Sequence, residues 1–170
     1  EFVGYDTTEA TASITRFRPL DEDRYQILLT KTPFYAESGG QIGDRGVIRA
    51  EDDSLVFRVI DTQKAPIGIV HTVEREKGTV DRDTTLKGEF VAEVDKSLRR
   101  QTVANHTATH LLHAALRDIV SDSIFQSGSL VSPEKLRFDF SYGERLSDQE
   151  LRAIEDRVNR LIREGHPVTP

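Results

Sequence analysis

The feature that most constrains the fold is the stretch from Lys96 to Gln126, in which neither glycine nor proline occurs. Glycine and proline are the strongest local breakers of regular structure, so this stretch favours one continuous helix. Asp95, directly before it, is a suitable N-cap residue. Apolar residues also recur there at helical spacing. They are Leu111, Leu112, Ala115, Leu116, Ile119 and Val120. We therefore expect a long helix that begins after Asp95 and ends near Ser121.

The residues before this helix have a different pattern, which is typical of strands. Short apolar or alternating segments are separated by turn-forming stretches such as Lys77-Gly78. The expected strands are residues 11–17, 25–30, 46–50, 55–60, 67–73 and 86–94. Six short strands at this spacing favour a small barrel or sandwich over alternating strand–helix units.

Two more strands and a second helix are expected after the long helix. The strands are residues 124–131 and 136–140. Ser147 and Glu150 form a capping box, and Gly165 supplies a C-terminal stop. Between them runs one apolar stripe, made of Leu151, Ile154, Val158, Leu161 and Ile162. The predicted fold class is therefore α+β, with a small β-barrel over residues 1–94 followed by an α+β unit over residues 95–170.

Composition excludes several classes of protein. The chain has no cysteine, so no disulfide framework is expected and nothing points outside the cytoplasm. No apolar run approaches the roughly 20 residues that span a bilayer, so no membrane partner is expected. The net charge of −6 argues against RNA binding through overall charge. Three basic clusters are either local phosphate contacts or ordinary solvated charges: Arg16 with Arg18, Lys96 with Arg99 and Arg100, and Lys135 with Arg137.

Two histidines lie four residues apart on the expected long helix. Four residues advance a helix by about 400°, so His106 and His110 leave the same face and could reach one metal ion. The glutamate of the HExxH protease motif is missing between them, which disfavours a metalloprotease. The competing interpretation is a pair of partly buried histidines that are hydrogen-bonded to their neighbours.

The other histidines have weaker patterns. His113 is close to the same helix face and could take part, although a structural role is the simpler interpretation. His71 and His166 have no partner pattern and are expected to be incidental. Zinc normally needs four ligands, or three and a water, so any metal site here requires ligands from elsewhere.

A glycine-rich stretch follows the second expected strand. Residues 32–46 contain four glycines within eight positions, which lets the backbone approach a ligand closely. Polar side chains surround these glycines, namely Thr32, Glu37, Ser38, Gln41 and Asp44. The stretch is either a binding loop or a wide barrel loop, and it is no P-loop because the Gly-Lys-Ser/Thr ending is absent.

Together these stretches resemble the alanyl-tRNA synthetase family. The resemblance rests on residues 2–5, 32–46, 105–117, 126–131 and 136–140, which occur in the order of that family. It implies an internal fragment of such an enzyme. The fragment would comprise the β-barrel and an incomplete α+β editing domain of the type shared with threonyl-tRNA synthetase.

The resemblance also implies a function. The whole enzyme joins alanine to its tRNA with ATP and Mg²⁺, and neither would bind to the part represented here. This segment is similar to the editing region, which hydrolyses tRNA-Ala wrongly charged with serine or glycine. The implied partners are the acceptor end of tRNA-Ala and the aminoacylation domain of the same polypeptide.

Site residues follow from the same resemblance. In the family, zinc is held by a His-x-x-x-His pair and a later Cys-x-x-x-His, and His106 with His110 matches the first pair. The second pair is absent from this chain, so the isolated fragment is expected to be inactive or weakly active. Thr32 matches a threonine associated with recognition of the serine hydroxyl. The expected editing pocket further includes Gly39, Gly40, Gln41 and Gln126, and the ester is expected to enter between the barrel and the α+β unit. No catalytic or RNA-binding residue is assigned.

Two alternatives remain at this point. The chain could be a free-standing trans-editing deacylase of the same superfamily. It could instead act as a non-catalytic RNA-binding or interdomain module.

Overall fold

The computed structural model describes residues 1–80 and 86–167. By its internal contacts the chain divides into two compact units, Glu1–Arg100 and Gln101–Pro170. The domain boundary expected between residues 94 and 95 stays a prediction.

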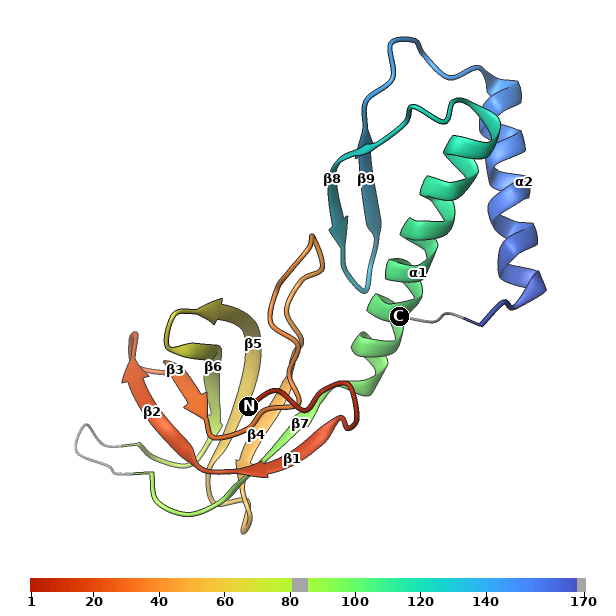
Figure 1. Ribbon diagram of the computed structural model, residues 1–170. Coiled ribbons are helices and arrows are strands. Elements are labelled where there is room, and N and C mark those ends of the chain that lie inside the picture. The colour runs from red at the N-terminus through yellow and green to blue at the C-terminus, as the bar shows by residue number, and fades with distance from the viewer. Residues whose placement is uncertain (81–85, 168–170) are drawn as a thin grey trace. The chain divides into compact units, whose positions relative to one another are not determined.

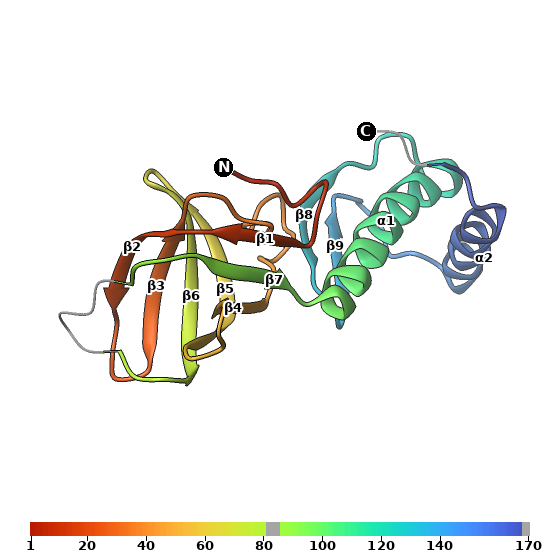
Figure 2. The same cartoon turned by 90° about the horizontal axis from the view of Figure 1, so that it is seen from below.

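The first unit contains one antiparallel sheet, curled into a half-barrel (Figure 1). Among the described residues its strands are β1 (Glu9–Ala12), β2 (Ile14–Pro19), β3 (Arg24–Leu29), β4 (Gly46–Ala50), β5 (Val56–Ala65), β6 (Gly68–Lys77) and β7 (Phe90–Val94). Their order across the sheet is β1-β7-β4-β5-β6-β3-β2. The strands at the two edges, β1 and β2, are consecutive in the chain and are separated only by Ser13. The sheet therefore has to curl until its edges approach each other, as Figure 2 shows from below.

The single strand expected over residues 11–17 is wrong, because the chain changes partners at Ser13. β1 pairs with β7, whereas β2 pairs with β3. Thr30 stabilises the break, since its backbone N–H donates to the Ser13 carbonyl at 3.0 Å and its hydroxyl accepts from the Ser13 amide at 3.1 Å. The other five expected strands exist: residues 46–50 match β4 at both ends, and the other four have shifted ends. Residues 86–89 lie outside β7.

The barrel interior holds the main apolar core. Alternate residues of the strands face it, as in β7, where Phe90, Ala92 and Val94 are buried and the residues between them are half-buried. The core residues are Tyr25, Ile27, Phe34, Ile48, Leu55, Phe57, Val59, Val73, Phe90, Ala92 and Val94. Phe34 comes from the glycine-rich stretch rather than from a strand, so this core fixes one end of that stretch.

The expected long helix is confirmed as α1 (Lys96–Ile119). Asp95 is its N-cap: its Oδ1 accepts hydrogen bonds from the amides of Ser97 at 2.9 Å and Leu98 at 3.0 Å. Within residues 1–80 and 86–167, neither helix is both long and apolar enough to span a bilayer.

The second unit packs a hairpin and a helix against α1. The hairpin consists of β8 (Gln126–Val131) and β9 (Leu136–Phe140), and the helix is α2 (Asp148–Glu164). Ser147 and Glu150 form the expected capping box, and Gly165 ends the helix at φ 62°. The buried core of the second unit consists of Ala115, Leu116, Ile124 and Ile154.

Candidate functional site

The glycine-rich stretch contains a tight reverse turn at Ser38-Gly39-Gly40-Gln41. The backbone N–H of Ser38 donates to the Gln41 carbonyl at 3.1 Å, and the N–H of Gln41 donates to the Ser38 carbonyl at 3.0 Å. Gly39 and Gly40 have φ of 60° and 84°, the left-handed values that such a turn requires at both central positions. These two glycines are therefore needed for the turn itself.

The turn is also tied to strand β5. The Glu37 carboxylate accepts from the Gln63 side-chain amide at 2.7 Å, and the Glu37 backbone N–H donates to the Thr62 carbonyl at 2.9 Å. At Gly43, an added Cβ would lie 2.2 Å from the Thr62 carbonyl oxygen, so only glycine fits. The glycine-rich stretch is therefore packed and hydrogen-bonded against β5.

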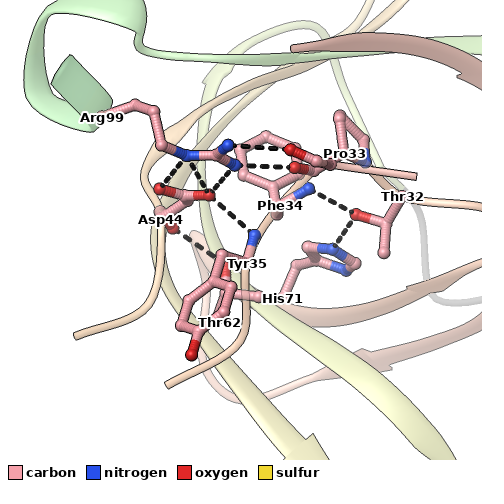
Figure 3. Close-up of polar contacts among 9 residues, drawn as sticks. Thr32, Pro33, Phe34, Tyr35, Asp44, Thr62, His71 and Arg99 are labelled. Carbon is pink, nitrogen blue, oxygen red and sulfur yellow. Dashed lines mark hydrogen bonds and ion pairs between the residues drawn. The ribbon is translucent and has the colours of Figure 1, made fainter. Parts of the chain in front are cut away.

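Thr32 begins this stretch and is almost fully buried, with 3% of its surface exposed. Its hydroxyl lies 2.8 Å from Nε2 of His71, and it accepts a hydrogen bond from the Phe34 amide at 3.1 Å (Figure 3). The other ring nitrogen of His71, Nδ1, lies 3.0 Å from the carbonyl oxygen of Ile27. Thr32, His71 and the Ile27 carbonyl thus form a buried hydrogen-bonded chain.

The donor and the acceptor in these two hydrogen bonds of His71 follow from the protonation state of its ring. Burial lowers the pKa of His71 from 6.5 to about 4, so the ring is neutral at neutral pH. A carbonyl can only accept, so Nδ1 carries the ring proton and donates it to Ile27. Nε2 is then a bare acceptor, and the Thr32 hydroxyl donates its proton to it. His71, expected to be incidental because it had no partner pattern, therefore has two buried hydrogen-bond partners.

A second buried polar contact joins Arg99, near the start of α1, to Asp44 at the end of the glycine-rich stretch. The Arg99 guanidinium forms an ion pair with the Asp44 carboxylate, with side chains 16% and 5% exposed. It also donates to the carbonyls of Gly4 and Pro33, each at 2.9 Å (Figure 3). The Asp44 carboxylate additionally accepts from the Tyr35 amide at 2.7 Å. Arg99 is therefore neither a solvated charge nor a phosphate contact, in contrast to both interpretations of its basic cluster.

In the second unit, His106 and His110 project together from α1. Their Nε2 atoms are 3.1 Å apart, and the rings are stacked with centroids 5.0 Å apart. Burial, and secondly the nearby His110, lower the pKa of His106, which favours its neutral, metal-binding form. The described residues include no group of three or more His, Cys, Asp or Glu side chains placed to hold a metal ion.

Two further predicted residues of the second unit, His113 and Gln126, have other hydrogen-bond partners. His113 has Nε2 3.3 Å from the Ile124 carbonyl and its ring 5.2 Å from that of Phe138, which fits a structural role. Gln126, at the start of β8, is exposed, and its amide donates to the Ser129 hydroxyl at 3.0 Å. The described structure places Thr32, Gly39, Gly40 and Gln41 in the first unit, and His106, His110 and Gln126 in the second.

The first unit also has a surface hollow of about 800 Å³. Its walls mix both signs of charge, with Arg45, Arg58 and Lys96 beside Glu74, Glu76 and Glu93. Arg58 is already paired with Glu74 and Glu76. None of the predicted site residues lines this hollow.

His71 and Arg99 are the residues that sequence reasoning missed. Each meets its partner across a long separation, 39 residues for His71 with Thr32 and 55 for Arg99 with Asp44. The hint for His71 was its place in an otherwise apolar strand segment, where a buried polar ring needs a hydrogen-bond partner.

Comparison with known proteins identifies the family to which the chain belongs. Residues 1–94, more than half of the chain, match the family model described as tRNA synthetases class II (A), and the chain belongs to this family.

The most informative relatives are alanine–tRNA ligases. The chain is 48% identical over 165 residues to that of Fusobacterium nucleatum, covering 97% of this chain and 18% of the ligase. It is 45% identical over 174 residues to that of Synechococcus elongatus, and 48% identical over 176 residues to that of Bacillus velezensis, in each case covering 98% of this chain and 19% of the ligase. The chain thus spans about a fifth of the length of these relatives.

Proposed function

We propose that this chain is the part of an alanine–tRNA ligase that takes part in hydrolysing tRNA-Ala charged with serine or glycine by mistake. The similarity to alanine–tRNA ligases over nearly the whole chain supports the parent enzyme. The observation that carries the editing role is the convergence of the His106 and His110 Nε2 atoms at 3.1 Å.

Such an enzyme has a physical need for a second site. A pocket that accepts alanine cannot exclude the smaller glycine, and an apolar pocket rejects an added hydroxyl only about 100-fold. A separate hydrolytic site can remove the wrong amino acid after it has been attached.

The histidine pair fits a zinc ion. Two imidazole nitrogens bound at about 2.0–2.1 Å with tetrahedral angles lie about 3.3 Å apart, close to the observed separation. His106 and His110 would supply two ligands, and the others would come from outside the described residues. A zinc ion held there would supply Lewis-acid polarisation or orientation of the substrate.

The first unit would supply recognition. Gly39 and Gly40 have no side chain, so a ligand would be able to approach the backbone of their turn closely. Thr32 would contact the serine hydroxyl, and Gln41 and Gln126 would offer amide groups to the ester or the ribose. ATP and Mg²⁺ would act in the aminoacylation domain of the same polypeptide, in the cytoplasm, and the tRNA acceptor end would be the shared partner.

Replacing both metal-ligand candidates tests this proposal. In a full-length ligase that carries this chain, His106→Ala with His110→Ala should abolish Ser-tRNA deacylation and leave alanine charging nearly intact. His166→Ala is the matched control, since its side chain is 67% exposed and pairs with the exposed Glu164 carboxylate, 2.8 Å away. Undiminished deacylation by the double variant would refute the role of the pair.

A further inference from the structure

The hydrogen bonds that link Thr32, His71 and the Ile27 carbonyl restrict how the Thr32 hydroxyl can bind a further group. A hydroxyl has one proton to donate and two lone pairs that accept. In this structure the proton goes to Nε2 of His71, and one lone pair accepts from the Phe34 amide. Within the part of the chain that the structure describes, what remains is one acceptor position.

His71 is well held for this task. Its ring is 0% exposed and is anchored on the far side by the Ile27 carbonyl, so it cannot turn to offer Nδ1 instead. It also packs edge-on against Phe34, with ring centroids 5.3 Å apart. The ring therefore presents the same bare nitrogen to Thr32 at all times.

We propose that His71 is a positioning residue that fixes the Thr32 hydroxyl as a hydrogen-bond acceptor, so that this position selects ligands which donate a hydrogen bond to it. The inference rests on the proposed function, in which Thr32 faces the aminoacyl group. The seryl hydroxyl is then recognised as a donor, and its own lone pairs are not used by Thr32. Because Thr32 is only 3% exposed, a ligand group that cannot donate would meet an acceptor with little access to water, at the cost of desolvation.

The ligand side is tested with three aminoacyl esters of tRNA-Ala on a full-length ligase that carries this chain. Serine can donate, 3-fluoroalanine is of similar size and cannot donate, and glycine has no side chain. We expect seryl-tRNA to be hydrolysed at least several-fold faster than 3-fluoroalanyl-tRNA. Equal rates for these two esters would overturn the acceptor assignment.

The protein side is tested with His71→Asn. Asparagine can still donate to Ile27, but its oxygen does not reach the place of Nε2, so the Thr32 hydroxyl is free to turn. We expect the Ser/Gly ratio of deacylation rates to fall about fivefold, the effect of one net hydrogen bond. Thr62→Val is the matched control for a merely structural loss, because the buried Thr62 hydroxyl donates to the Asp44 carbonyl instead. It should lower both rates together, and a His71→Asn variant that behaves likewise would overturn the proposal.

A measurement independent of activity covers variants that fail to fold. Long-range proton–nitrogen correlation spectra of the unaltered 170-residue chain distinguish the protonated ring nitrogen from the bare one. The proton on Nδ1 of His71 is the expected result, and a proton on Nε2 would defeat the inference. By contrast, a ligase that hydrolyses neither seryl- nor glycyl-tRNA would remove the proposed function while leaving the ring assignment standing.

Discussion

At the residue scale, the first unit contains two buried polar pairs. His71 with Thr32 and Arg99 with Asp44 each join residues far apart in the sequence. Buried polar groups cost little only when every partner is in place, so losing one member leaves the other unsatisfied. Each pair has one member in the glycine-rich stretch, Thr32 at its start and Asp44 near its end.

The buried imidazole makes stability depend on pH. Above pH 6.5 both folded and unfolded chains hold a neutral His71. Between pH 6.5 and about 4 the unfolded chain binds a proton that the folded chain does not, so the unfolding free energy falls as pH is lowered through this window. The loss is on the order of 3 kcal/mol. Urea unfolding of the chain at several pH values should show that His71→Asn removes this component, whereas His166→Asn, at an exposed position, retains it.

Removing Arg99 should destabilise the first unit strongly. Arg99→Met leaves the Asp44 carboxylate buried without its cation, a loss of about 3–5 kcal/mol in unfolding free energy. Arg157→Met is the control, because its ion pair with Asp118 is largely exposed, with side chains 35% and 51% accessible. That pair should be worth less than about 1 kcal/mol. Comparable urea midpoints for the two variants would show that the Arg99 contacts contribute little.

At the element scale, the glycine-rich stretch is shaped by what lies beneath it. Its close approach to β5 leaves no room for a side chain at Gly43, and its reverse turn needs positive φ at Gly39 and Gly40. The starts of the two helices are set locally, by the N-cap residues Asp95 for α1 and Ser147 for α2. We therefore expect substitutions at these three glycines to disturb the glycine-rich stretch.

A pair of glycine substitutions tests this fit. Gly43→Ala would place a methyl group 2.2 Å from a backbone oxygen of Thr62, so the glycine-rich stretch or β5 must shift. Gly143→Ala meets nothing within 4 Å and is the matched control. Thermal unfolding of the chain should show a clear loss for Gly43→Ala, on the order of 1–3 kcal/mol, and almost none for Gly143→Ala. A Gly43→Ala variant as stable as the parent would mean that the contact is easily relieved.

At the scale of the whole molecule, the proposed zinc site would need more than the histidine pair. Two imidazoles without further ligands bind a metal weakly, because affinity depends on the full ligand set. Among the described residues, no third metal-binding side chain joins His106 and His110. Zinc chemistry at this pair, as proposed, would therefore depend on residues beyond those described.

Zinc content provides the test. The 170-residue chain should lose zinc on dialysis and leave Ser-tRNA unhydrolysed. A version extended by the Cys-x-x-x-His segment of an alanine–tRNA ligase should keep close to one zinc per chain and hydrolyse Ser-tRNA. Mass spectrometry and a deacylation assay measure these outcomes. Tight zinc binding by the shorter chain would show that it completes the site by itself.

The sequence by itself determined the local elements. The cap at Asp95, the stretch without glycine or proline and the capping box at Ser147 act over a few residues, and each was confirmed. Five of the six strands expected before the long helix were also confirmed, most with shifted ends, whereas the strand expected over residues 11–17 was wrong. The helical spacing of His106 and His110 likewise predicted that their rings would meet. These features depend on chain neighbours alone.

Only the tertiary structure decided how distant residues meet. The chain exchanges strand partners at Ser13 because the curled sheet brings its two edges together, which no local pattern encodes. The buried partners of His71 and Arg99 come from segments 39 and 55 residues away. A polar residue in a sequence shows only that it can form hydrogen bonds. Which partner it finds, and in which direction the proton is donated, is set by the packing around it.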